Sequence, residues 1–301
     1  MKQTYYFATF AMALISSISL AEAGITVLNQ NGSFTISSSN TGIERQLNIW
    51  AQPGQPRGKI IANYIEATDE CDFNGVRVGK GNGNMGSNTA VGYAAMDGSG
   101  PYGDLCTAVG SYAMQYNSSG AANTAIGHAA MLGNTSGYYN TASGTNAMRL
   151  NNAGSQNTAM GMNSAYHTQG GNYNSAFGMS ALHLNQSGGE NTAIGVNALH
   201  GTKSSWNTAL GTNALAFNST GHSNVAIGTN AGTVHQDGTT ALTTTFGSIY
   251  IGASSRGFNN ADNNSIVIGT GAWGEGANTT VIGNGATVST HLYGQTISHS
   301  L

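Results

Sequence analysis

Histidines are the first candidates for chemistry in this sequence, because an imidazole can bind a metal ion or transfer a proton near neutral pH. His183 and His200 each follow a recurrent glycine by five residues. In a chain of stacked repeats they would lie on adjacent turns, about 5 Å apart, where two imidazoles could hold a metal ion. No third ligand shares that position to complete a tetrahedral set. We therefore interpret the pair as an exposed ladder and predict no metal site.

The segment Gly81–Gly86 fits the G-x-G-x-x-G pattern of dinucleotide sites. Such a site needs a preceding strand and a following helix, and neither pattern surrounds this segment. The chain holds 44 glycines, enough to produce the string by chance. The serines, histidines and acidic residues form no catalytic triad and no carboxylate pair. The sequence thus predicts no cofactor and no enzymatic activity.

The element that positions these residues is a repeated phrase, Asn-Thr-Ala-Ile-Gly, which occurs verbatim at Asn123–Gly127 and Asn191–Gly195. A helical repeat is excluded, because a glycine within each copy would cost about 1 kcal/mol relative to alanine. The near-constant spacing of mostly 17 residues indicates a solenoid, and we predict an all-β fold with two short strands per repeat. The glycines that close the phrase are Gly92, Gly110, Gly127, Gly144, Gly161, Gly178, Gly195, Gly211, Gly228, Gly252, Gly269 and Gly283.

Two positions before the glycine, alanine occurs nine times in succession, from Ala90 to Ala226. The position directly before the glycine is mostly large and apolar, and a second phrase, usually ending in Ala-Met or Ala-Leu, follows the glycine. Because side chains alternate along a strand, the alanine and the large residue must point to opposite faces. We expect the large residues and the Met or Leu to fill a thin interior. The alanine and glycine face would then stay outside and pack against identical chains in a cyclic oligomer.

Threonine recurs three positions before the glycine, and asparagine recurs four positions before it. A flat threonine ladder could bind ice. Here, however, each threonine shares a face with the large apolar residue two places on, so we expect this ladder inside the coil or at an edge, which argues against ice binding. Asparagine tolerates left-handed turns and can bond to its copies above and below, so we interpret its column as structural.

Charged residues make up only 7% of the 301 residues, against about a quarter in typical proteins. From residue 81 onward there are three basic and six acidic residues, so the sequence predicts no basic surface for nucleic-acid binding. Residues 1–23 have the basic start, apolar run and small-residue cleavage site of a secretory signal, so we expect export. No later stretch approaches the roughly 20 apolar residues of a membrane helix, and we find no intrinsic membrane anchor.

The chain divides into the signal at 1–23, an N-terminal β segment at 24–75, the repeats at 76–286, and a C-terminal strand or tail at 287–301. The repeats resemble the head domain of trimeric autotransporter adhesins, the YadA-like or Hep-Hag family, whose repeats carry the phrase Ser-Val-Ala-Ile-Gly. This resemblance implies a left-handed parallel β-roll of about 12 short coils, a homotrimer, and binding to host matrix, glycans, cells or surfaces. The period of 17 residues is longer than the family's. The heptad stalk and barrel strands that anchor the family are not seen, so the tether stays open.

We therefore expect a non-enzymatic adhesin or fibre head, outside the cell or at its surface. The alternatives are a secreted filament subunit or phage-fibre-like protein assembled by strand exchange, with Gly24–Ile36 completing a neighbour, and an ice-binding solenoid. Ligand contact should be distributed over stacked loops, because every coil offers similar groups. The candidate contacts are the loop aromatics Tyr102, Tyr116, Tyr138, Tyr139, Tyr173 and Trp206.

Cys71 and Cys106 are the only cysteines in the sequence, and a pair in an exported protein is expected to be bridged. Cys106 occupies a position that is asparagine in the other early repeats, which indicates that its sulfur has a partner. A bond within the chain would pin the N-terminal segment to the first coils, and a bond between chains would staple the oligomer. We favour the bond within the chain.

Overall fold

The computed structural model describes residues 71–73, 76–81, 87–98, 103–287 and 289. The predicted signal, nearly all of the N-terminal segment, Tyr102, most of Gly81–Gly86 and most of the last segment lie outside these residues, and the predictions made for them stay predictions. The described residues form strands and turns and contain no helix. This part of the chain accordingly offers no helix that is long and apolar enough to cross a membrane.

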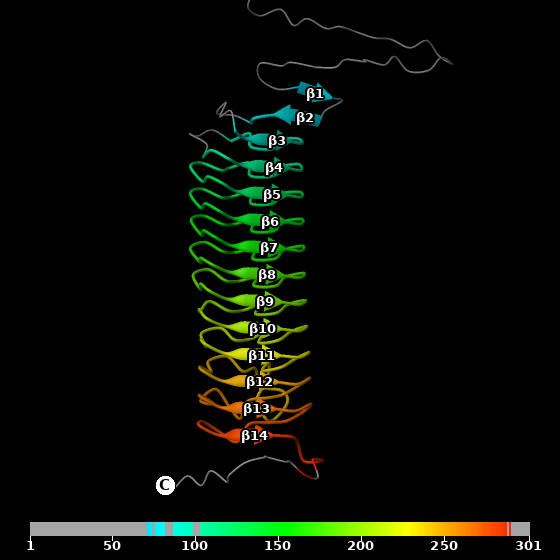
Figure 1. Ribbon diagram of the computed structural model, residues 1–301, viewed down its shortest axis with the longest axis vertical. Helices are drawn as coiled ribbons and strands as arrows, with labels where there is room; N and C mark the ends of the chain where they lie inside the picture. The colour runs from blue at the N-terminus through cyan, green and yellow to red at the C-terminus, as the bar shows by residue number, and fades with distance from the viewer. Residues whose placement is uncertain (1–70, 74–75, 82–86, 99–102, 288, 290–301) are drawn as a thin grey trace, which may run out of the picture. The chain divides into compact units, whose positions relative to one another are not determined.

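The strands form one 14-stranded sheet in which each strand is hydrogen-bonded to the next strand of the sequence (Figure 1). The pairs β1–β2 and β2–β3 are antiparallel, and all pairs from β3 to β14 are parallel. The prediction of an all-β parallel solenoid is confirmed, with about 11 turns. The strands are β1 (Cys71–Phe73), β2 (Val76–Gly79), β3 (Thr89–Val91), β4 (Thr107–Val109), β5 (Thr124–Ile126), β6 (Thr141–Ser143), β7 (Thr158–Met160), β8 (Ser175–Phe177), β9 (Thr192–Ile194), β10 (Thr208–Leu210), β11 (Val225–Ile227), β12 (Ile249–Ile251), β13 (Ile266–Ile268) and β14 (Thr280–Ile282).

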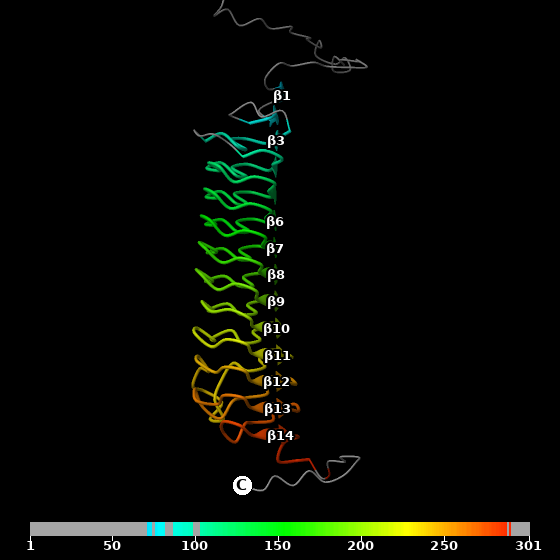
Figure 2. The ribbon, with the colours of Figure 1, turned by 60° about the vertical axis from the view of Figure 1, so that its left-hand side comes forward.

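The register of the sheet follows from the repeat. Equivalent residues lie opposite each other in neighbouring strands, so that Thr107 pairs with Thr124. Figure 2 shows the strands on one side of the coils and the loops on the other. Hydrogen bonds between coils continue into these loops, for example from the Met131 N–H to the Ala147 carbonyl at 2.9 Å. A slip of one residue would break bonds around the whole coil and turn every side chain over, so the constant repeat length fixes the register.

The two faces of the strands are the reverse of the prediction. The alanines from Ala108 to Ala226 at the strand position are 0% exposed, whereas Ile126 and Met160, directly before their glycines, are both 46% exposed. The reason is the small interior of a coil that contains a single three-residue strand. Met131 and its equivalents enter this interior from the second phrase and join the alanines in one apolar cluster. With that large side chain in place, close packing leaves room only for alanine beneath the strand.

The second phrase forms a turn, so the prediction of two strands per repeat is wrong. Met131 and Leu199 adopt left-handed backbone conformations, with φ of 49° and 50°. Large residues rarely take up this conformation. Here it turns the side chain into the interior, where both residues are 0% exposed, and the burial of apolar surface offsets the backbone strain.

The recurrent glycines have the structural role that was predicted for them. Gly178 has a φ of 133°, and a Cβ at this position would lie 2.6 Å from the carbonyl oxygen of Gly195. Gly195 meets Gly211 in the same way, at 2.6 Å. Consecutive coils therefore approach each other at this column too closely for any side chain, and the backbone conformation there also favours glycine.

The last coils depart from the regular array. An insertion between β11 and β12 contains an isolated antiparallel bridge from Val234 to Ala241. At the buried alanine position β12 carries Tyr250, which is 0% exposed. Its hydroxyl donates to Oδ2 of Asp262 at 3.3 Å, and the same oxygen accepts the Phe258 N–H at 3.0 Å. Burial raises the pKa of Tyr250, and the charge of Asp262 adds to this effect, so the hydroxyl remains protonated and can donate.

Candidate functional site

The asparagine column four positions before the glycine belongs to the interior. Asn140 is 1% exposed, and its Nδ2 donates to the Gly154 carbonyl at 2.8 Å. Its backbone N–H donates to Oδ1 of Asn123, and its own Oδ1 accepts the Asn157 N–H, both at 2.9 Å. Asn140 thus bonds through its side-chain amide to residues 14 and 17 positions further along the chain, and through its backbone N–H to the asparagine of the preceding coil. The structural role predicted for this column is confirmed, and its polar groups are already paired.

A second buried ladder lies seven positions after the glycine and was missed from the sequence. Nδ2 of Asn134 donates to Oδ1 of Asn117 at 2.7 Å and to the Gly137 carbonyl at 3.0 Å. Asn151 repeats the contact with Asn134 at 2.8 Å. The sequence did contain a signal, because asparagine or threonine recurs there in seven successive coils, from Asn117 to Asn218. The members are Asn117, Asn134, Asn151, Thr168, Asn185, Thr202 and Asn218.

His183 and His200 lie in contact on adjacent coils, as their spacing predicted, but both are half-buried, so the prediction of an exposed ladder is wrong. Their rings stack with centroids 4.9 Å apart and an interplanar angle of 4°. Tyr166 stacks on His183 from the other side at 5.2 Å, and His167 meets it edge-on at 6.0 Å. Burial lowers the pKa of both stacked histidines, and the charges of His200 and His167 lower that of His183 further. Among the described residues, no three His, Cys, Asp or Glu side chains gather to hold a metal ion.

The threonine column lies on the outer face of the sheet, so the prediction that it lies inside or at an edge is wrong. Thr89, Thr141, Thr208 and Thr280 are exposed, and the other threonines of the column are half-buried. As alternation requires, the large apolar column shares this face. We call the surface formed by these two columns the outer sheet face. Its exposed large side chains, each 37–46% exposed, are Ile126, Met160, Phe177, Ile194, Leu210, Ile227 and Ile282.

The predicted aromatic contacts that the structure describes are all exposed, by 51–64%. Tyr139, Tyr173 and Trp206 occupy one column, five positions before the glycine. Their backbone is left-handed, with φ of 59°, 59° and 62°. Tyr138 packs edge-on against Tyr139, with ring centroids 5.8 Å apart. Tyr116 lies outside this column, in the turn that follows β4. The structure therefore brings three of the candidates into one line.

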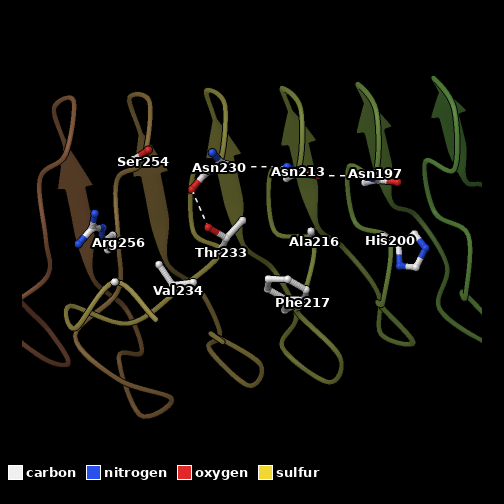
Figure 3. Close-up of a pocket in the computed structure, with 11 residues that line it drawn as sticks. Asn197, His200, Asn213, Ala216, Phe217, Asn230, Thr233, Val234, Ser254 and Arg256 are labelled. Carbon is white, nitrogen blue, oxygen red and sulfur yellow. Dashed lines mark hydrogen bonds between the residues drawn. The ribbon is translucent and has the colours of Figure 1, made fainter. Parts of the chain in front are cut away.

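An open groove of 560 Å³ runs along four coils beside the insertion that follows β11 (Figure 3). One wall is a ladder of amides, in which Asn197 donates to Asn213 at 3.2 Å and Asn213 donates to Asn230 at 3.0 Å. His200 and Arg256 also line it. Its amides and its cation could bind hydroxyl or carboxylate groups. No local motif marks this groove, because its residues come from four coils and an insertion.

Cys106 is a free, buried thiol. Its Sγ lies 3.4 Å from the Gly120 carbonyl, and Asn117 Nδ2 lies 3.8 Å from the sulfur, so the thiol stands in for the asparagine amide. Burial raises the pKa of the Cys106 thiol. Cys71 lies in β1, which β2 and β3 separate from β4, and three strand spacings are about 14 Å, beyond disulfide range. The predicted bond within the chain is not formed in this structure, and the alternative between chains stays a prediction.

Comparison with known proteins gives no relative from which a function could be transferred. No family model matches the chain, and neither a curated protein nor a solved structure matches it. The resemblance to adhesin heads therefore stays a prediction that rests on the repeat phrase.

Proposed function

We propose that the chain is an exported, non-enzymatic adhesive or fibre-forming head that assembles with two identical chains into a trimer. The observation that carries this proposal is the outer sheet face, where large apolar side chains follow one another through the five successive coils from Met160 to Ile227 at 37–46% exposure. A contiguous apolar surface of this kind is unusual on a monomer and is typical of an interaction site.

A second copy of the chain fits this surface better than an unrelated partner does. Two solenoids have the same spacing between coils, about 4.8 Å, so the ladder of one copy can pack between the side chains of the other along its whole length. From β3 to β14, the threonine column and the large apolar column contain no charged residue, so identical faces do not repel each other. Closed rotational symmetry then limits the assembly to a discrete head.

Sedimentation of the mature chain tests the trimer, with a mass of three chains as the expected result. Leu210→Asp places a carboxylate on the outer sheet face and should give a monomer with an unchanged circular dichroism spectrum. Leu184→Asp is the matched control, because Leu184 is 36% exposed against 44% for Leu210 but lies in the turn after β8. A wild-type chain that sediments as a stable monomer would contradict the trimer.

Ligand binding by such a head is distributed over the coils, because each coil presents similar asparagine, serine, threonine and tyrosine groups and few charges. Binding to matrix proteins, glycans and whole cells should be screened with the wild-type chain. A substitution in a single coil should weaken binding without removing it. If one point substitution on one coil abolished binding to every ligand, contact would be local and this part of the proposal would fail.

Ice binding is a second candidate, favoured by the position of the threonine column. Its members lie on the outer sheet face in register, with Thr124 opposite Thr141 and Thr141 opposite Thr158. A flat, regular array of hydroxyl and apolar groups is a surface that could order water. Measurable thermal hysteresis, reduced by Thr141→Lys, would support this candidate. A wild-type chain without thermal hysteresis would exclude it.

A further inference from the structure

The column five positions before the recurrent glycine alternates between large and small side chains. Leu105, Tyr139, Tyr173 and Trp206 occupy every second turn and are 65%, 64%, 58% and 57% exposed. We call these four side chains the comb. The turns between them carry Ala122, Gln156 and Glu190 at the same position, and the turn after Trp206 carries Ser223.

The backbone holds the members of the comb in equivalent positions. Their φ angles lie between 59° and 62°. The N–H groups of Tyr139, Tyr173 and Trp206 each bond to a carbonyl of the preceding coil at 3.1 Å. Successive members therefore leave the solenoid at the same point of the coil, two strand spacings apart, which is about 9.6 Å.

Packing within the chain does not explain why these residues are large. A left-handed backbone disfavours large side chains, and in the last coils the same position is Gly247, Asn264 and Asn278. The buried Met and Leu of the second phrase also have left-handed backbones, but their burial offsets that strain. More than half of the surface of each comb residue is exposed, so this compensation is mostly absent. Strain kept at an exposed position indicates a function.

The spacing restricts the ligand to a polymer whose equivalent faces recur about every 9.6 Å. In an extended β-1,4-linked polysaccharide, every second sugar presents the same apolar ring face, so this face recurs once per disaccharide. The length of a disaccharide matches two strand spacings, about 9.6 Å. An aromatic side chain offers a broad apolar face together with a polar tip, which suits stacking on a sugar ring. We infer that the comb binds a neutral, extended β-1,4-linked polysaccharide, with one disaccharide for every two turns.

The neighbours of the comb agree with such a ligand. Gln156 lies on the turn between Tyr139 and Tyr173, and Ser223 lies on the turn after Trp206. Their polar groups can bond to the sugar hydroxyls. Tyr138 packs edge-on against Tyr139 at 5.8 Å, and His222 packs edge-on against Trp206 at 6.4 Å, which limits the orientations of two comb rings. Glu190 is the one charged residue of the column between Leu105 and Ser223, so this line has no cations with which to attract an acidic polymer.

A polyproline-type peptide is the competing ligand, because it repeats every three residues, or about 9.3 Å. Such peptides dock into grooves lined by aromatic side chains. The groove beside the insertion is lined by other residues, of which Phe217 is the only aromatic apart from His200. The comb stands on exposed turns, and this arrangement favours a polymer with flat faces. The glycan inference rests on the proposed surface-binding function and specifies its ligand.

Co-sedimentation of the full mature chain with insoluble cellulose and chitin tests the inference. Starch granules and a collagen-like triple-helical peptide serve as comparison ligands. We expect binding to at least one β-1,4-linked polymer, and a loss of about tenfold in affinity for Tyr173→Ala, by analogy with the loss of one stacked aromatic contact. Tyr93→Ala removes a tyrosine with similar exposure, 61% against 58%, from outside the column and should change nothing. Alanine is tolerated in this conformation, since Ala122 has it already.

A register variant separates the spacing from the mere number of aromatic side chains. Tyr139→Gln combined with Gln156→Tyr keeps the composition of the column but moves one ring to an adjacent turn, and we expect it to bind as weakly as Tyr139→Ala. Full binding by this variant, or wild-type binding to the collagen-like peptide alone, would overturn the inference. Absence of binding to both β-1,4-linked polymers would also overturn it and would leave the trimer intact. Conversely, a monomeric chain that still bound these polymers through the comb would refute only the trimer.

Discussion

The regular coils from β3 to β11 and the last coils from β12 to β14 build the same backbone around different interiors. In the regular coils the strand contributes alanine, and buried asparagine ladders close the coil. In β12 the alanine is replaced by Tyr250, and Ser248 and Ser265 take the asparagine position. Asp262 stands where the regular coils have the glycine whose carbonyl accepts the amides. A coil of this kind therefore needs a filled interior and paired polar groups, which more than one set of residues can supply.

The two interiors differ in how far their hydrogen bonds extend. In the column four positions before the glycine, each asparagine from Asn140 to Asn224 donates its backbone N–H to the asparagine of the preceding coil, and its Oδ1 accepts the N–H of the following coil. This pattern can continue from coil to coil without limit. Ser248 still donates to the Asp262 carbonyl at 2.6 Å and accepts the Ser265 N–H at 3.2 Å. The Ser265 hydroxyl is buried and has no hydrogen-bond partner among the described residues. The ladder thus ends in the last coils, as expected for terminal repeats.

The recurrent glycines should show the largest difference between the two regions. In the regular array, Gly178→Ala would place a Cβ 2.6 Å from the next carbonyl oxygen on a backbone with φ of 133°, whereas at Gly269 the nearest atom lies 3.2 Å away. We expect Gly178→Ala to lower the free energy of unfolding by about 3 kcal/mol and Gly269→Ala to lower it by less. Urea unfolding gives the size of the effect, and hydrogen exchange locates it.

Gly170 supplies the control for this comparison. A Cβ at Gly170 would meet no atom within 4 Å, so Gly170→Ala should leave the unfolding midpoint unchanged. Equal midpoints for Gly178→Ala and Gly170→Ala would show that the contact between neighbouring coils at this column does not limit stability.

The asparagine ladder should give the second largest effect. Asn157→Ala removes the amide that donates to the Gly171 carbonyl at 2.8 Å and the oxygen that accepts the Asn174 N–H at 2.9 Å. Two buried backbone groups lose a partner, and we expect a destabilisation of about 2–4 kcal/mol.

The matched substitution in the last coils is Ser265→Ala. It removes a hydroxyl without a hydrogen-bond partner in the described structure, and it should be neutral or slightly stabilising. The measurement is the urea midpoint of each variant with its far-ultraviolet spectrum. Similar losses for both substitutions would remove the distinction between a continuing ladder and a terminated one.

The sequence predicted the period, the parallel solenoid and the glycine column, because these depend on spacing alone. It could not decide which face of the strand is buried, since alternation separates Ala125 from Ile126 without saying which of them points inward. That choice depends on Met131, whose left-handed turn fills the interior from the other side. The alignment of the comb residues was not recognised in the sequence, because they lie at different distances from their preceding glycines. Trp206 lies 11 residues after its preceding glycine and Tyr173 lies 12 residues after its own, and the two align only when counted back from the next glycine.

The stacked histidines should give the smallest effect on the free energy of unfolding. The regular spacing of the coils places these two rings in contact, and the last coils have no histidine at this position. The position of His183 and His200 is occupied by Thr233, Gly257 and Gly274 in the coils that follow β11, β12 and β13. Burial and the charges of His200 and His167 lower the pKa of His183 below its usual value of 6.5, and burial lowers the pKa of His200. The unfolded chain therefore binds more protons than the folded chain just below pH 6.5, and stability falls as the pH decreases through this range.

Because both rings are partly solvated, the loss on acidification should be on the order of a few tenths of a kcal/mol. It can be measured as the difference between the urea midpoints at about pH 7.5 and about pH 5, the range in which histidine titrates. His183→Gln should reduce this difference, since it removes the ring whose pKa is lowered by burial and by the charges of His200 and His167. His128→Gln, at an exposed position outside the stack, should leave it unchanged. If the urea midpoint fell by the same amount on acidification in both variants, the pH dependence would belong to other groups, and stacking of His183 on His200 would not lower stability.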